Sequence, residues 1–138
     1  MRRIRGFTLT EMVIVLVMAG ILAAVVIPQF SPQQTNASWF YEQVKSGVRY
    51  AQRQAVAQRR TVYVVMNAST VSLCYDSGCS SPVNNFATGA AYTLTAPSGV
   101  ALAPLTFSFN GLGQPSAAAT FSVGGSTITV SAETGYVQ

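Results

Sequence analysis

The feature that most constrains this chain is an apolar run close to its N-terminus. Residues 12–27 read MVIVLVMAGILAAVVI, sixteen positions without a charged side chain. Counted from Phe7, where a more mixed stretch begins, the segment has twenty-one residues. A helix of that length would extend roughly 32 Å, close to the roughly 30 Å hydrocarbon thickness of a bilayer. The sequence therefore predicts a helix that spans a membrane once.

Basic residues before the apolar run indicate its orientation. Arg2, Arg3 and Arg5 lie within the first five residues, and the next basic residue along the chain is Lys45. The positive-inside rule therefore places the N-terminus in the cytoplasm and everything after Pro28 outside. We expect a single-pass protein of the inner membrane whose bulk is exported.

Three interpretations of this segment compete: a cleaved signal peptide, a plain anchor, and a helix that is processed but retained. Cleavage after Ala24 would put Leu22 where a signal peptide needs a small residue, and the apolar run continues through Ile27. A plain anchor has no use for Glu11, because a carboxylate costs about 2.5 to 3.5 kcal/mol at the centre of a membrane helix and less near an end. Both observations favour the third interpretation.

The residues around Glu11 carry a family resemblance. The stretch RGFTLTE at residues 5–11, followed by the apolar run and a proline, resembles the class III signal of type IV prepilins and type II secretion pseudopilins. The resemblance implies that a prepilin peptidase cuts after Gly6 and N-methylates Phe7. It also implies that Glu11 pairs with the N-terminal ammonium of a neighbouring subunit, which would fix orientation more than affinity. Thr10 departs from the aliphatic residue that is commoner in the family.

Prolines interrupt the chain after the apolar run. Pro28 removes a backbone donor and crowds the preceding turn, and Pro32 follows four residues later, so we expect a helix kink at Pro28 and a hinge that extends to Asn36. The expected organisation has three parts: a cleaved leader at residues 1–6, a hydrophobic transmembrane and filament-core helix with its hinge at residues 7–36, and a globular head at residues 37–138.

Residues 38–58 have the pattern of an amphipathic helix. Five apolar side chains follow the spacing of one helical stripe: Phe40, Val44, Val48, Ala51 and Ala55. Lys45, Arg49 and Arg53 recur every four residues on another side. This basic stripe fits contact with DNA phosphates or acidic lipid, and it also fits a solvated helix face. We favour the solvated face, because like charges at this spacing cost only a few tenths of a kcal/mol each.

Beyond Thr61 the apolar period changes to that of β-strands. Strands are expected at residues 61–66, 70–75, 91–95, 105–109, 120–123 and 127–130. Turn sequences at residues 67–69 and 124–126 predict two hairpins. The predicted fold class is α+β, in which a long N-terminal hydrophobic α-helix packs the C-terminal half of its length on an antiparallel β-sheet of four to seven strands. The resemblance to prepilins implies that this is the pilin fold.

Cys74 and Cys79 are the only cysteines of the chain. Two thiolates without a histidine make half a zinc site, so we expect no metal. Export favours a structural disulfide between the two. The spacing is not that of a redox motif, and no basic neighbour lowers a thiol pKa.

The inventory of acids and bases excludes several enzyme classes. The chain has no His, one Asp and three Glu, so a Ser/His/Asp triad and a histidine metal site are impossible. Charged residues make up 9% and hydrophobic residues 49%, and the aromatic content is too high for a disordered chain. We expect a folded structural protein with no catalytic residues and no cofactor.

A second resemblance covers most of the chain after the apolar run. It rests on the helix segment at residues 48–56, the strand pair that follows it, FNGLGQP at residues 109–115, and TGYV at residues 134–137. These look like the GspH/FimT group of minor pilins and pseudopilins, and in form they are closest to the MshC-type minor pilins of mannose-sensitive haemagglutinin pili. The resemblance implies a minor pilin that sits near the filament tip and helps initiate assembly.

The same resemblance implies partners and alternatives. The partners are the prepilin peptidase and other pilin subunits, with the inner membrane before assembly and then a pilus outside the cell or a periplasmic pseudopilus. The alternatives are a minor pseudopilin of type II secretion, of the GspH kind, and a DNA-binding minor pilin. FimT-type members bind DNA through a basic C-terminal region, whereas residues 131–138 contain no Arg or Lys, so we do not expect nucleic acid as a partner.

Overall fold

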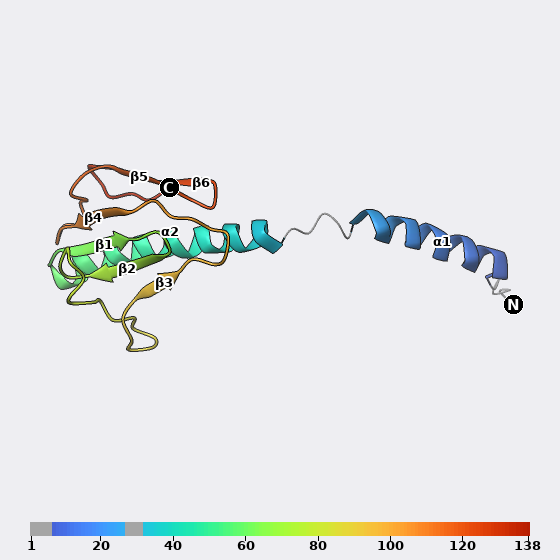
Figure 1. The fold of residues 1–138 in the computed structure, drawn as a ribbon, viewed down its shortest axis with the longest axis horizontal. Helices are drawn as coiled ribbons and strands as arrows, with labels where there is room; N and C mark the ends of the chain where they lie inside the picture. The colour runs from blue at the N-terminus through green and yellow to red at the C-terminus, as the bar shows by residue number, and fades with distance from the viewer. Residues whose placement is uncertain (1–6, 27–31) are drawn as a thin grey trace, which may run out of the picture. The chain divides into compact units, whose positions relative to one another are not determined.

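Figure 1 shows the computed structural model, in which residues 7–26 and 32–138 are described. The chain divides into two compact units, Met1–Pro32 and Gln33–Gln138. Helix α1 spans Leu9–Val26 in the first unit. Helix α2 spans Pro32–Gln58 and precedes six strands of the second unit.

Helix α2 starts earlier than the sequence analysis predicts. We expected a hinge between Pro28 and Asn36 and a helix from Ser38, but the chain is already helical from Pro32 onward, so the part of the expected hinge at residues 32–36 is wrong. A proline is well suited to the first helical position, because its missing N–H has no partner there and its fixed φ already suits a helix. Pro28 lies outside the described residues, and the kink at that position stays a prediction.

The predicted apolar stripe of α2 is confirmed as the centre of the core. Its five members are completely buried: Phe40, Val44, Val48, Ala51 and Ala55. The stripe belongs to one cluster with the inward residues of the strands, among them Val64, Leu73 and Phe109. Figure 1 shows α2 lying along the strands of the second unit. The fold is α+β, with a helix packed on an antiparallel sheet.

The sheet beside α2 has four antiparallel strands in the order β3-β2-β1-β4. The strands are β1 at Val62–Met66, β2 at Thr70–Cys74, β3 at Thr93–Thr95 and β4 at Leu105–Phe109. Alternation of buried and less buried residues along β1 shows that one face of the sheet is covered. The predicted hairpin between β1 and β2 is confirmed, with Met66 opposite Val71.

The last two strands form a separate hairpin rather than extending the first sheet. Strand β5 spans Ala119–Val123 and β6 spans Ser126–Val130. Gly124 and Gly125 connect them with φ of 58° and 87°, a left-handed backbone that favours glycine in a two-residue turn. We expected a single sheet, and the strand pairing instead gives a four-stranded and a two-stranded sheet.

The C-terminal segment closes the head against α2. Val137 pairs with Val130 in an isolated bridge, so the chain end covers the outer edge of β6. Gln52 on α2 donates from Nε2 to the carbonyl oxygens of Gly113 and Thr134, at 2.9 and 3.0 Å. One side-chain amide therefore connects the helix, the loop after β4 and the C-terminal turn.

Candidate functional site

The start of α1 carries a helix cap that includes the backbone of Glu11. Thr8 precedes the first helical residue, and its hydroxyl oxygen accepts a hydrogen bond from the Glu11 N–H at 3.3 Å. The Thr8 carbonyl oxygen accepts from the Met12 N–H at 3.2 Å. Thr-x-x-Glu is the sequence pattern of a capping box, and a carboxylate in the first turn suits the positive end of the helix dipole. Glu11 therefore stabilises its own helix, a role that our sequence analysis missed.

The remaining surface of α1 is apolar and uncovered within the described unit. Its large hydrophobic side chains between Leu9 and Leu22 are at least half exposed, from Leu9 at 81% to Val13 at 50%. The exposed residues occur at successive positions and therefore on every side of the helix. Exposed apolar surface of this extent marks an interaction site with lipid or protein.

Two of the predicted processing and assembly residues lie together at this end of α1. Phe7 and Glu11 line one shallow hollow of about 220 Å³, together with Met12 and Val15. Phe7 is 76% exposed and precedes the helix. Gly6, on the other side of the predicted cleavage point, lies outside the described residues. The Phe7 side chain and the Glu11 carboxylate thus lie side by side at the start of an uncovered helix.

The three basic residues predicted on α2 have different surroundings. Arg49 donates from Nη2 to the carbonyl oxygen of Val137 at 2.9 Å, in a partly buried contact. Lys45 places its Nζ 5.5 Å from the centre of the Tyr41 ring, a cation–π distance. Arg53 is exposed. Arg49 thus holds the C-terminal segment in place. This contact favours the interpretation of the basic stripe as an ordinary helix face over its interpretation as a site for phosphates.

Cys74 and Cys79 form a disulfide that closes a short loop at the end of β2. Inside this loop the Asp76 carboxylate accepts hydrogen bonds from the backbone N–H groups of Ser80 and Ser81 at 2.8 and 2.7 Å. The Ser80 bond above all, followed by the Ser81 bond, lowers the pKa of Asp76. The loop is thus held by a covalent bond and by a carboxylate that stays ionised.

Removal of the disulfide should lower stability without abolishing the fold. For the double variant Cys74→Ala/Cys79→Ala we expect a loss of about 2 kcal/mol in the free energy of unfolding, because closure of so short a loop removes little entropy from the unfolded chain. Chemical denaturation of the full chain in detergent measures this loss. Reductant should destabilise the native chain by a similar amount and leave the variant unchanged. A native chain that is insensitive to reductant would contradict the prediction.

Comparison with known families identifies the N-terminal region. Residues 1–27 match the family model described as the prokaryotic N-terminal methylation motif. The match contains Gly6, Phe7 and Glu11, and it supports a type IV pilin-like protein. Comparisons with curated proteins and with solved structures give no significant match.

The methylation motif indicates how the chain is processed and assembled. It indicates processing by a prepilin peptidase and assembly with other pilin subunits. It points to a structural subunit rather than an enzyme. The class III signal also implies that the N-terminal region inserts into a membrane before assembly.

Across residues 7–26 and 32–138, no helix has both the length and the apolar character needed to cross a membrane. Within the expected span of residues 7–27, helix α1 begins at Leu9, because Thr8 caps it from outside, and Ile27 lies outside the described residues. The orientation inferred from the N-terminal arginines stays a prediction. The same described ranges contain no cluster of three or more side chains suited to a metal ion.

Proposed function

We propose that the chain is a minor pilin, an exported structural subunit that takes part in assembling or initiating a type IV pilus. The prepilin peptidase removes residues 1–6 and methylates the new N-terminus at Phe7. Residues 7–36 then form the filament-core helix and the segment that joins it to the head, and residues 37–138 form the head. The methylation motif is the observation that carries the proposal.

The exposed surface of α1 supports a role in assembly. A helix that is apolar on every side gains stability only by burial in lipid or against other helices, and each fully buried Leu, Ile or Val contributes about 1.5 to 3 kcal/mol. The side chains from Phe7 to Ala24 are exposed in the described unit, so burial is left to a partner. Transfer from membrane to filament keeps this surface covered at both stages.

The choice of a pilus over a secretion pseudopilus rests on the resemblance of the head to minor pilins. The methylation motif fits both systems, and a GspH-like minor pseudopilin is the alternative. A DNA-binding minor pilin is less well supported, because Arg49 already donates to the Val137 carbonyl oxygen. In both filament systems the N-terminal chemistry is the same.

Intact mass spectrometry of the chain extracted from membranes tests the processing step. In cells with the prepilin peptidase we expect loss of residues 1–6 and gain of one methyl group on Phe7. Cells without the peptidase should give the uncut chain, and so should Gly6→Val in cells with it, because the signal resembles one that is cut after a glycine. An uncut native chain, or one cut near Ala24, would contradict the proposal.

A further inference from the structure

A groove of about 480 Å³ lies between α2 and the segment that leads into β3. Gln43 and Ser46 line it from the helix. Asn85, Thr88 and Tyr92 line it from the other side. The volume falls within the roughly 300 to 1,000 Å³ of small-molecule sites. Neither the apolar helix α1 nor the disulfide loop contributes to it.

The loop wall of the groove is held in place by its own hydrogen bonds. Asn85 donates from its backbone N–H to the Ala90 carbonyl oxygen at 2.7 Å, and its side-chain oxygen accepts from the Ala87 N–H at 2.9 Å. The Tyr92 ring stacks on Tyr50 of α2, with ring centres 5.1 Å apart. The groove therefore has two walls fixed relative to each other before any ligand binds.

Hydrogen-bonding groups of the groove are left for a ligand. Within the described part of the chain, the side chains of Gln43 and Ser46 have no hydrogen-bond partner. The Asn85 side chain uses only its oxygen, so its amide N–H groups are also available. Amides and hydroxyls both donate and accept. Such a set matches a ligand that is itself rich in hydroxyl groups.

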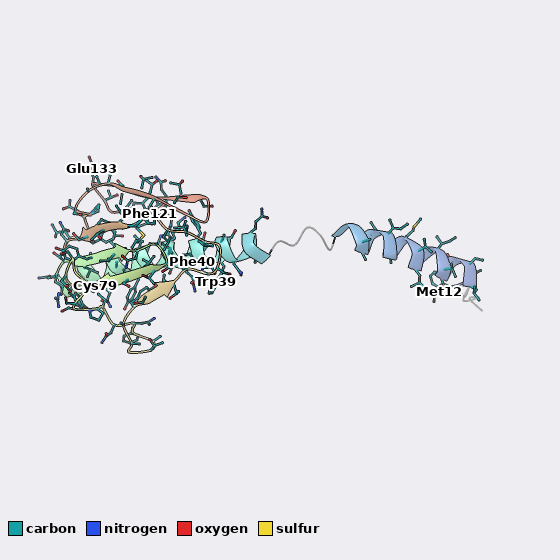
Figure 2. All side chains as sticks on the ribbon, viewed as in Figure 1. Met12, Trp39, Phe40, Cys79, Phe121 and Glu133 are labelled. Carbon is teal, nitrogen blue, oxygen red and sulfur yellow. A yellow bond between two sulfur atoms is a disulfide. The ribbon has the colours of Figure 1, made fainter. Side chains whose placement is uncertain are left out.

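An exposed tryptophan lies on the same face of α2. Trp39 precedes Gln43 by four residues and Ser46 by seven, a spacing that places all three side chains on one helix face. Trp39 is 64% exposed, and Figure 2 shows it beside the buried Phe40. Trp39 does not line the groove itself, but it lies about one helical turn from Gln43 and offers a flat apolar surface there.

The lining of the groove is uncharged. Each of its residues is an amide, a hydroxyl, an aliphatic or a tyrosine, and burial, with a smaller effect of Tyr50, raises the pKa of Tyr92 and keeps that hydroxyl neutral. An anionic ligand would find no ion-pair partner in the lining. A protein partner would need a wide apolar core for its contact, which this polar lining does not provide.

We propose that this groove binds a neutral oligosaccharide. Gln43, Ser46 and Asn85 hydrogen-bond the sugar hydroxyls, and the face of one pyranose ring stacks on Trp39. The inference takes from the proposed function only that the head is exported, where such sugars are met. A chain that is processed as a pilin but binds no sugar would refute this inference alone.

Fluorescence titration of the full chain tests the proposal, because Trp39 is the only tryptophan. The chain is kept in a detergent without a sugar headgroup and titrated with maltohexaose, cellohexaose and chitohexaose. We expect at least one of these neutral probes to shift the emission with saturation at millimolar concentration or below. Hexagalacturonate, a charged probe of equal length, should bind at least about tenfold more weakly.

Variants of α2 separate the groove from general surface effects. Gln43→Ala/Ser46→Ala should weaken binding about tenfold, the loss expected for two hydrogen bonds. Gln58→Ala removes a glutamine of the same helix outside the groove and should leave affinity unchanged. Trp39→Ala, followed by calorimetry, should lose at least as much affinity as the double variant, and Trp39→Phe should recover part of it.

Three outcomes would overturn the proposal. The first is that none of the neutral probes saturates. The second is equal affinity for hexagalacturonate, which would instead indicate contact with the arginines of α2. The third is native affinity in Gln43→Ala/Ser46→Ala. Unchanged unfolding midpoints in all variants are expected, since the exchanged side chains lie outside the core.

Discussion

Glu11→Ala should insert, be processed and fold, yet enter filaments at less than about a tenth of the native amount. Glu11 is the one charged residue of α1, and apart from Thr10 the other residues of the helix are apolar or glycine. In a filament core a lone charge is costly unless it is paired, whereas a pair with the methylated terminus of a neighbour fixes the register of docking. Quantitative immunoblots of sheared filaments and of membranes measure the two populations.

Thr8→Ala is the matched control for this experiment. It removes the hydroxyl that accepts from the Glu11 N–H and so costs the helix about 1 kcal/mol at its N-terminus, but it leaves the carboxylate in place. If Glu11 acts through pairing between subunits, Thr8→Ala filaments contain nearly native amounts of the subunit and Glu11→Gln behaves like Glu11→Ala. Equal defects in Thr8→Ala and Glu11→Ala would assign the effect to helix capping.

Periodicity was sufficient to predict the core. The spacing of three and four residues puts the apolar residues of α2 on one face of the helix. The sheet packs on that face, and all five residues of the stripe are buried. The strand predicted at residues 105–109 has the bounds of β4, Leu105–Phe109. The helical stripe and the strand pattern both arise from the spacing of apolar residues a few positions apart. This spacing can be read directly from the sequence.

The interpretation was wrong or incomplete where a residue has two possible roles. Pro32 was interpreted as a helix breaker, although a proline at the first helical position costs no hydrogen bond. Glu11 was interpreted only as an assembly residue, although Thr8 three residues earlier completes a capping pattern. In both cases the sequence contained the relevant residues. Their role depends on where the helix begins, because Pro32 is the first residue of α2 and Thr8 lies just before α1.

Contacts between distant segments could not be predicted from the sequence. The strand expected at residues 91–95 begins only at Thr93, because the Tyr92 N–H donates to Val83 and its ring stacks on Tyr50. The contact of Arg49 with Val137 joins residues 88 positions apart. The groove lined by Gln43 and Asn85 depends on the same kind of contact, so no local pattern indicates it.

Gly135→Ala should destabilise the head by about 3 kcal/mol or more. The residue has φ of +67°, which costs an L-residue roughly 1 to 2 kcal/mol. An added Cβ would also meet the backbone oxygen of Gly113 and the Gln52 amide that connects helix, loop and chain end. Overpacking of this kind costs about 1 to 3 kcal/mol more, because a backbone oxygen cannot turn aside like a flexible side chain.

Gly89→Ala separates the two contributions, since Gly89 has nearly the same φ, +68°, and nothing within 4 Å of an added Cβ. Chemical denaturation of both variants in the full chain should show a loss of about 1 to 2 kcal/mol for Gly89→Ala, the conformational cost alone. The excess for Gly135→Ala then measures how tightly the C-terminal turn packs on α2. Equal losses would mean that this turn does not close the head, and that the TGYV sequence at residues 134–137 is required only for its backbone conformation.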